Sequence, residues 1–261
     1  MKLCFSTLGC ADRTLDEIIA LADRYGIKYI EFRGVDGVID NTQIEDFSVR
    51  AAENTKRALS ASGMTPIVLG SSCYFQDEES CERYIAEGKA NIEIAEGLGI
   101  PYVRVFGDRI KDKKTTERVI SALTQLCEHA ENTIVLLETH GDFNSVQTLA
   151  PIVESMNGRE NFGLLWDIEH THKVYGRNWE EFYDFARPYV CHVHIKDYSN
   201  SAKALSNIGR GDVPIREIAD RLVRDGYTGC FSLEWEKKWH PELASIEIAL
   251  DDFVRVMECE V

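Results

Sequence analysis

Four residues of the kind that bind metals and move protons each follow a short apolar run in this chain. They are Glu138 after residues 133–137, Asp167 after 162–166, His194 after 190–193 and Glu234 after 230–233. Successive members are 29, 27 and 40 residues apart, which is about the length of one βα unit. Because the strands of a parallel barrel end at the same rim, we expect the four side chains to converge there.

Three carboxylates and one imidazole suit a single divalent cation. Carboxylates aimed into one mouth would repel one another, and a bound dication offsets that charge. Thiolates are absent from the set, so we expect an oxygen-rich Mn²⁺ or Mg²⁺ type of site, with Zn²⁺ and Co²⁺ as alternatives. Each residue taken singly also has a structural explanation, such as a solvated strand end or a helix cap. The prediction therefore depends on the four together.

His192, His194 and Lys196 occupy alternate positions of one strand-like segment. Strand alternation sends all three to one side, with Val193 and Ile195 on the other. Buried imidazole and ammonium groups without partners are costly, so this pattern favours a functional role over a purely structural one.

Nearby polar residues enlarge the candidate site. His170 follows Asp167 by three positions, so both side chains meet over one pocket if the segment between them turns. Glu236 comes two residues after the last of the four ligand candidates and could share its role. Arg33 and Arg104 could enter the pocket or form ion pairs within the barrel layers.

Strand-like and amphipathic helix-like segments alternate along the chain. Strands are expected at residues 2–6, 28–32, 65–69, 102–106, 133–137, 162–166, 190–195 and 229–233. Helices are expected at residues 14–25, 42–62, 78–98, 115–130, 145–155, 179–185, 214–224 and 243–257. This pattern predicts an α/β fold, a single (β/α)8 TIM barrel domain over residues 1–261, with an open doubly wound sheet as the alternative.

Composition limits the classes of partner. The net charge of −15, without a basic stripe, argues against nucleic acid. No run approaches the roughly 18 consecutive apolar residues of a membrane span, and the opening strand-like segment is too short for a signal peptide. We therefore expect no membrane partner and a cytoplasmic location. The eight cysteines include no Cys-x-x-Cys pair, so most are expected to be buried small hydrophobic residues.

The motifs around these residues resemble one family. They are Leu-Glu-Thr-His at 137–140, Trp-Asp-Ile-Glu-His at 166–170, His-Val-His-Ile-Lys-Asp at 192–197, Gly-Arg-Gly-Asp at 209–212 and Ser-Leu-Glu at 232–234. In this order, and over essentially the whole chain, they are similar to the xylose-isomerase-like barrel superfamily, in particular its sugar isomerase and epimerase branch. The ordered set is specific for the superfamily but not for a substrate.

The resemblance implies one divalent metal ion held by the four strand-end residues, with manganese expected and magnesium, cobalt or zinc as alternatives. It also implies that Glu138 and Glu234 transfer a proton through a metal-stabilised enediolate. His140, His170 and Lys196 are then expected to bind substrate oxygens. The substrate would be a small sugar or polyol. Relatives often form homodimers or homotetramers, and no feature of this sequence fixes the number.

Rival functions stay open on the sequence. A metal-dependent dehydratase or lyase acting on a keto-inositol or a 3-keto-glycoside would use the same residues. A non-catalytic sugar-binding or partner subunit would keep the barrel without turnover. DNA-damage endonucleases of this fold carry further histidines after strands 3 and 4, where this chain has none. Ketose 3-epimerases carry an arginine shortly after the histidine strand, where this chain has Lys196, Lys203 and Arg210.

A phosphate site is a weaker prediction. Gly209 and Gly211 precede the seventh expected helix, where many barrels bind phosphate. The adjacent Asp212 argues against an anion there.

Overall fold

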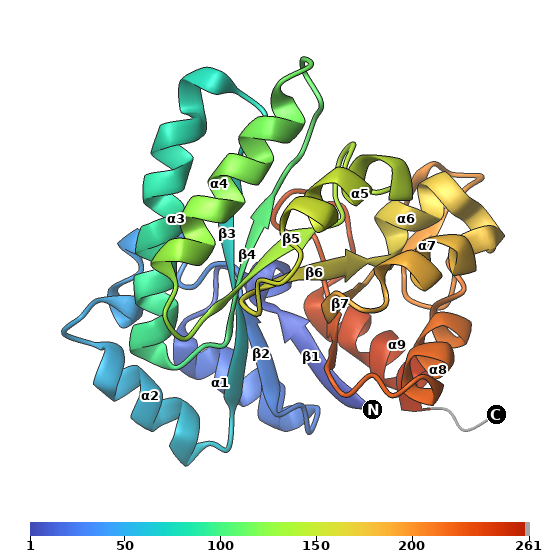
Figure 1. Ribbon diagram of the computed structural model, residues 1–261. Helices are drawn as coiled ribbons and strands as arrows, with labels where there is room; N and C mark the ends of the chain where they lie inside the picture. Colours follow the sequence, from blue (N-terminus) through green and yellow to red (C-terminus); the bar gives the residue numbers. More distant parts are fainter. Residues whose placement is uncertain (259–261) are drawn as a thin grey trace.

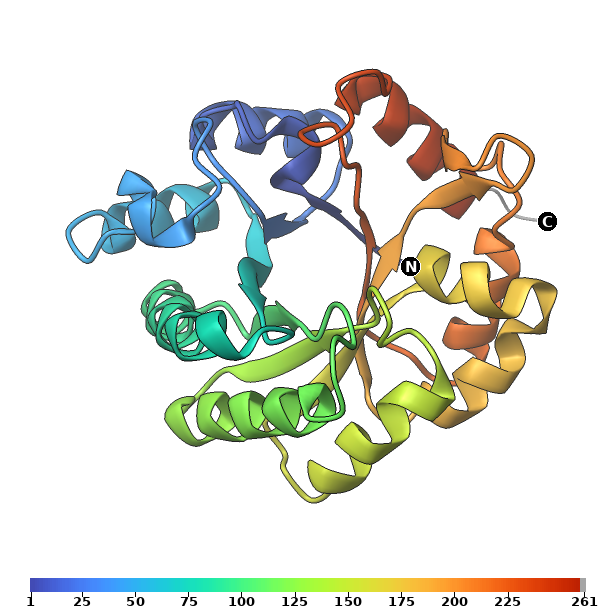
Figure 2. The same ribbon diagram turned by 90° about the horizontal axis from the view of Figure 1, so that it is seen from above.

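The centre of the computed structural model, which describes residues 1–258, is a closed barrel of eight parallel strands (Figures 1 and 2). The strands are β1 (Lys2–Ser6), β2 (Tyr29–Phe32), β3 (Thr65–Tyr74), β4 (Tyr102–Phe106), β5 (Ile134–Glu138), β6 (Phe162–Asp167), β7 (Val190–Ile195) and β10 (Cys230–Leu233). They pair in chain order, and β10 returns to β1 to close the ring. The predicted TIM barrel is confirmed.

Helices surround the barrel on its outside (Figure 2). They are α1 (Leu15–Arg24), α2 (Ala52–Ala61), α3 (Glu78–Leu98), α4 (Thr115–His129), α5 (Val146–Ser155), α6 (Ile168–Tyr175), α7 (Trp179–Ala186), α8 (Ile215–Arg224) and α9 (Ile246–Glu258). The start of α1 is a capping box, in which Thr14 and Glu17 each bond the other's backbone N–H.

Successive side chains along each strand point alternately to the layer between strands and helices and to the inside of the barrel. Val135, Leu137 and Trp166 belong to the hydrophobic core, and Trp166 stacks on Tyr183 of α7. They therefore fill the layer between strands and helices. Residues at the alternate positions point into the barrel, and towards the carboxyl ends of the strands these are polar, as Glu138 is. The alternation places the polar groups where a site can form.

The helix expected over residues 42–62 is shorter than predicted. Within this range, only Ala52–Ala61 (α2) form an α-helix. The residues before α2 form two 3₁₀ turns, Asn41–Gln43 and Glu45–Phe47. Asp40 accepts a hydrogen bond from the Thr42 backbone N–H, and Ile44 is extended with ψ of 118°. A local side-chain cap and an extended residue therefore interrupt the amphipathic pattern.

A helix and a hairpin near the candidate site were not predicted. The helix α6 begins directly after Asp167, whose side chain accepts hydrogen bonds from the backbone N–H groups of Glu169 and His170. A short antiparallel hairpin, β8 (Asp197–Ser199) with β9 (Ala204–Ser206), follows β7. Both lie at the carboxyl end of the barrel, where they extend the rim.

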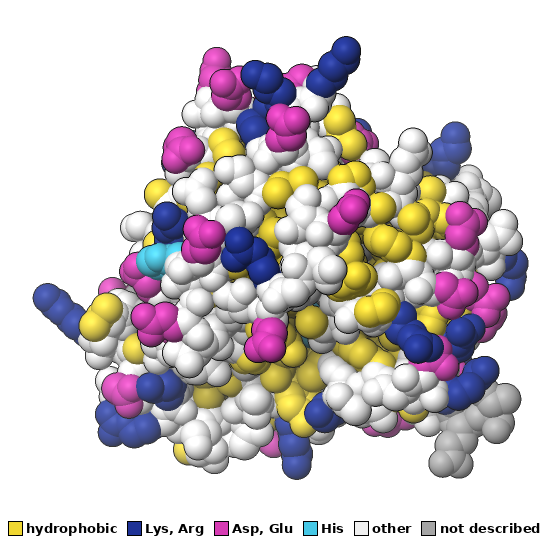
Figure 3. Space-filling model, in the orientation of Figure 1, with side chains coloured by type: hydrophobic (Ala, Val, Ile, Leu, Met, Phe, Trp, Pro, Cys, Tyr) yellow, Lys and Arg dark blue, Asp and Glu magenta, His cyan; other side chains and the backbone are white. Residues whose placement is uncertain are grey.

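The surface carries charges of both signs. On the face drawn in Figure 3, the basic and acidic side chains of the described residues are interspersed without a continuous basic stripe. Within residues 1–258, no helix is both long enough and apolar enough to cross a membrane.

Most cysteines are buried, as expected. The buried ones are Cys4, Cys10, Cys73, Cys81, Cys127 and Cys230. Cys191 is half-buried, and Cys259 lies outside the described residues.

Candidate active site

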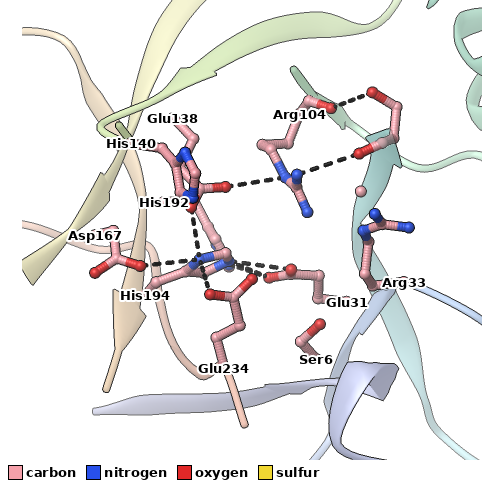
Figure 4. Close-up of polar contacts among 12 residues, drawn as sticks. Ser6, Glu31, Arg33, Arg104, Glu138, His140, Asp167, His192, His194 and Glu234 are labelled. Carbon is pink, nitrogen blue, oxygen red and sulfur yellow. Dashed lines mark hydrogen bonds and ion pairs between the residues drawn. The ribbon is translucent and has the colours of Figure 1, made fainter. Parts of the chain in front are cut away.

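The four predicted ligand residues meet at the carboxyl end of the barrel (Figure 4). One donor atom from each of Glu138, Asp167, His194 and Glu234 lies within 4.8 Å of all the others. We call this set the cage. His194 Nδ1 is 3.8 Å from Glu138 Oε1, 3.9 Å from Asp167 Oδ2 and 3.4 Å from Glu234 Oε2. All four residues are buried. Their convergence is thus observed, while their role as metal ligands stays a prediction.

Strand register produces this convergence. Asp167 at the end of β6 lies beside His194 of β7, and His194 lies beside Ser232 of β10. Glu234 follows two residues after Ser232 and so points to the same side. Glu138 ends β5, the other neighbour of β6. Four adjacent strands therefore deliver one side chain each to the same level of the barrel.

The cage fits a divalent cation. Among the described residues, His194 Nδ1 is buried without a hydrogen-bond partner, although it faces the three cage carboxylates. An imidazole nitrogen surrounded by three carboxylate groups is the donor set of a hard or borderline dication. A cation at this point would give the unpaired His194 Nδ1 a partner.

The two glutamates of the cage have opposite electrostatic environments. Burial raises the pKa of Glu138, and the Arg104 guanidinium opposes this shift without cancelling it. Burial acts on Glu234 in the same direction, but His194 and Lys196 outweigh it and hold its pKa well below the ordinary value. The two carboxyl groups therefore differ in proton affinity.

Lys196 penetrates the cage from the residue after β7. Its Nζ lies 2.8 Å from Asp167 Oδ2, 2.7 Å from Glu234 Oε2 and 2.7 Å from Glu236 Oε1. Burial would lower the pKa of this lysine, yet the carboxylates of Asp167 and Glu234 hold it well above the ordinary value. The predicted substrate-binding lysine is thus a buried ammonium that touches two cage carboxylates.

Two arginines lie beside the cage. Arg104 Nε is 3.1 Å from Glu138 Oε2, so this arginine forms an ion pair with a cage residue. Arg33 instead donates to Ser72 Oγ at 3.0 Å. A Cβ at Gly70 would lie 2.9 Å from Arg104 Nη2 and 2.9 Å from Arg33 Cδ. Glycine at this position of β3 therefore leaves space for both side chains.

The two predicted histidines at the rim lie together. The rings of His140 and His170 are 4.3 Å apart, and His140 Nδ1 is 3.4 Å from Asp108 Oδ1. Burial would lower the pKa of His140, but Asp108 raises it above the ordinary value. Burial, together with Lys196, holds the pKa of His170 well below its ordinary value. A neutral ring and a more basic ring are therefore paired at the entrance.

Sequence reasoning missed the carboxylate behind the cage. Glu31 of β2 is fully buried and contacts His192 Nε2 at 3.0 Å and His194 Nε2 at 2.9 Å. The alternation pattern placed His192 on the inner side of its strand. The hydrogen-bond partner of His192 is therefore Glu31, which is not a cage residue. A signal was present, because Glu31 is a charged residue within the apolar segment Tyr29–Phe32.

The Gly209–Gly211 loop already holds an anion from its own chain. Asp197 Oδ2 accepts the backbone N–H of Gly209 at 2.9 Å and of Gly211 at 2.8 Å, and Oδ1 accepts that of Val213 at 3.2 Å. These amides are the donors that a phosphate group would need. The loop is therefore occupied by a carboxylate.

Comparison with known proteins places the chain in a family. A family model described as xylose isomerase-like TIM barrel matches residues 19–253. An inosose isomerase of Halalkalibacterium halodurans is 25% identical over an alignment that covers 98% of this chain and 96% of that protein. The predicted resemblance to the superfamily is thereby confirmed.

Solved structures agree in fold. The IOLI protein with a binding zinc atom matches with a TM-score of 0.80 at 23% identity over 98% of both chains. The probable 3-DHS dehydratase AsbF of Bacillus anthracis matches with a TM-score of 0.79 at 17% identity over 100% of both chains. D-psicose 3-epimerase with D-tagatose from Clostridium cellulolyticum matches with a TM-score of 0.74 at 17% identity, over 99% of this chain and 100% of that chain.

Proposed function

This chain belongs to the xylose isomerase-like TIM barrel family, and on that premise we propose that it is a divalent-metal-dependent sugar isomerase or epimerase. One observation carries the proposal. Glu138 and Glu234 lie on either side of the His194 ring, with carboxylate oxygens 3.8 Å and 3.4 Å from its Nδ1 (Figure 4). Two carboxylates around one candidate metal position are what a proton-transfer reaction on two faces of a substrate requires.

The cage would hold the metal through Glu138, Asp167, His194 and Glu234. When bound, a divalent ion would supply a Lewis acid that stabilises negative charge on substrate oxygen. Manganese is the ion we propose, because oxygen donors dominate the set. The zinc atom named for the IOLI protein keeps zinc as an alternative.

The chain's own residues then move the proton. One glutamate takes a proton from the carbon next to a substrate carbonyl, and the C–H electron pair passes into an enediolate. The second glutamate returns a proton to the opposite face, which gives an epimer, or to the neighbouring carbon, which gives an isomer. Lys196 is placed to donate hydrogen bonds to substrate oxygens beside Glu234. His140 and His170 would orient hydroxyls at the entrance.

The substrate we propose is a small uncharged sugar or polyol. One relative that aligns over 98% of the chain is an inosose isomerase, which supports a keto-polyol as one candidate substrate. The amides that would bind a phosphate group are taken by Asp197, which favours a substrate without phosphate.

A dehydratase or lyase is the second candidate, and Lys196 is the observation that favours it. A buried ammonium 2.7 Å from Glu234 is an acid that can protonate a leaving hydroxide after the same first step. Elimination would then replace reprotonation at carbon. The complete set of four cage residues argues against a non-catalytic sugar-binding subunit.

Deuterium exchange with product analysis tests the proposal. Protein loaded with Mn²⁺ is incubated in D₂O with ketoses, keto-inositols and 3-keto-glycosides, and NMR follows the carbon next to the carbonyl. We expect deuterium incorporation together with an isomeric product. An unsaturated product would identify the dehydratase. Bound metal without exchange in any substrate would overturn the proposed function and favour a binding role.

A variant pair links the exchange to the cage. Glu234→Gln keeps the size of the side chain but cannot accept the proton, so exchange should slow by about 10²-fold or more. Glu53→Gln is the matched control, because Glu53 is an exposed residue of α2 far from the cage in sequence and pairs with Lys56. Its exchange rate should equal that of the wild type.

A further inference from the structure

Glu31 is the hub of a buried polar cluster directly behind the cage. Its carboxylate lies 2.9 Å and 3.0 Å from His194 Nε2, 3.0 Å from His192 Nε2 and 3.0 Å from Ser232 Oγ. All four residues are fully buried. Figure 4 shows Glu31 on the far side of the His194 ring from Asp167.

These contacts fix which nitrogen of His194 carries a proton. An ionised carboxylate only accepts hydrogen bonds, so both histidines must present an N–H at Nε2. Three polar groups converge on the Glu31 carboxylate, namely His192 Nε2, His194 Nε2 and Ser232 Oγ, and hydrogen bonds to a carboxylate favour its ionised form. A His194 ring whose single proton is on Nε2 has its lone pair on Nδ1, the atom that faces the three cage carboxylates.

The same contacts fix the plane of the ring. Nε2 lies within hydrogen-bond distance of both oxygens of Glu31, which resists rotation about the ring axis. Ser232, the strand neighbour of His194 across β7 and β10, also donates to Glu31 and so ties the carboxylate to the adjacent strand. Three strands, β2, β7 and β10, thus hold the orientation of one imidazole.

A purely structural role does not require this chemistry. Apolar residues of similar volume commonly stabilise a core as well as or better than a buried charged cluster. A charged carboxylate with two imidazoles at this position has instead the arrangement that orients a histidine for metal binding.

We propose that Glu31 is a positioning residue that presents His194 Nδ1 to a divalent ion in the cage. This inference rests on the proposed function, because it needs the cage to bind a metal. Glu31 itself does not touch the substrate or the reacting atoms. His192 shares the carboxylate and keeps it from turning away from His194.

Metal affinity of a Glu31→Gln variant tests the proposal. Glutamine has nearly the same shape, but it offers one acceptor oxygen and adds an N–H₂ donor that opposes the histidine N–H groups. The Mn²⁺ dissociation constant, measured by electron paramagnetic resonance of free Mn²⁺, should rise about 10- to 100-fold. The matched control is Glu87→Gln, a half-buried glutamate of α3 without contact to either histidine. It should bind Mn²⁺ as the wild type does.

A second measurement uses the wild type alone and does not depend on folding of the variant. Nitrogen-15 NMR of the zinc-loaded protein should show His194 protonated at Nε2 and bound to metal at Nδ1. The reverse pattern would overturn the proposal. So would an unchanged Mn²⁺ affinity in folded Glu31→Gln protein. Two ions per wild-type chain, with one lost in the variant, would make Glu31 a ligand and also overturn it. A wild type that binds no divalent ion would instead overturn the proposed function itself.

Discussion

Lys196 and Glu234 lie 2.7 Å apart, from Nζ to Oε2, although one follows β7 and the other follows β10. The ammonium also lies 2.8 Å from Asp167, a second cage residue. A bound dication and this lysine would therefore attract the same oxygens. The lysine offsets part of the negative charge of the cage, and its contacts must change in strength when a metal binds.

Replacement of Lys196 by methionine should separate metal binding from turnover. Removing a positive charge next to the cage should tighten Mn²⁺ binding by about tenfold or more, since close like charges repel by several kcal/mol even at an effective dielectric constant of about 20. Turnover should fall by about 10²-fold or more, because the donor to the substrate is lost. Titration calorimetry and deuterium exchange measure the two effects.

Lys56→Met serves as the control for this charge change, because Lys56 pairs only with Glu53 among the described residues. Both its affinity for Mn²⁺ and its exchange rate should stay at wild-type values. Weaker Mn²⁺ binding by the Lys196 variant would contradict the view that lysine and metal attract the same carboxylates.

Removal of metal should lower the thermal stability of the protein. A ligand that binds only the folded state stabilises it by about 2.7 kcal/mol at a concentration of 100 times its dissociation constant. Addition of a chelator, followed by calorimetric melting, should therefore give a lower Tm that excess Mn²⁺ restores. In Asp167→Asn protein the restoring effect should be smaller. An identical Tm with and without saturating Mn²⁺ would argue against a metal in the cage.

Gly211→Ala should destabilise the fold. A Cβ at Gly211 would lie 2.2 Å from Asp197 Oδ1 and 2.6 Å from the Tyr198 carbonyl oxygen. We expect a loss of about 1–3 kcal/mol, the usual cost of overpacking, in urea unfolding. Gly97→Ala is the matched control, since that Cβ meets nothing within 4 Å in helix α3. It should be neutral or slightly stabilising. Equal effects of the two changes would refute the packing argument.

Acid should weaken the contact that ties the start of the barrel to its last helix. Arg13 bonds Glu247 of α9 and lowers the pKa of that carboxyl from the ordinary 4.5 to about 2. A depressed pKa means that the stabilisation is present above about pH 4.5 and is lost as the pH falls towards about 2. Glu247→Gln should cost at most about 1 kcal/mol near neutral pH, because the pair is partly exposed.

Urea unfolding of wild type and Glu247→Gln over a series of pH values measures this linkage. The difference in unfolding free energy between them should shrink as the pH falls below about 4.5. A difference that stays constant over that range would show that the contact does not depend on the charge of Glu247.

The sequence predicted those parts of the site that depend on local pattern. A polar residue directly after an apolar run marks a strand end, and this rule located Glu138, Asp167 and Glu234. Two-residue alternation placed His192 and His194 on the inner side of β7. The helix after Asp167 was missed because a capping aspartate and a turn have the same appearance in sequence.

Pairings across the barrel could not be predicted in the same way. Glu31 precedes His194 by 163 residues, and only ring closure brings β2 within reach of β7. The spacing of residues in the sequence does not show which inward-pointing side chains of different strands contact one another inside the barrel. The charged residue within the apolar β2 segment indicated a buried polar contact. The histidines that Glu31 contacts could be identified only from the three-dimensional structure.

The two carboxylate oxygens of Asp167 make different contacts. Oδ1 accepts the backbone N–H groups that begin α6, while Oδ2 faces the cage. The same side chain therefore anchors the helix that carries His170 and completes the candidate ion site. An ion bound by this carboxylate would also affect the first turn of α6. Ion binding in the cage and the position of His170 at the entrance are therefore coupled through one residue, Asp167.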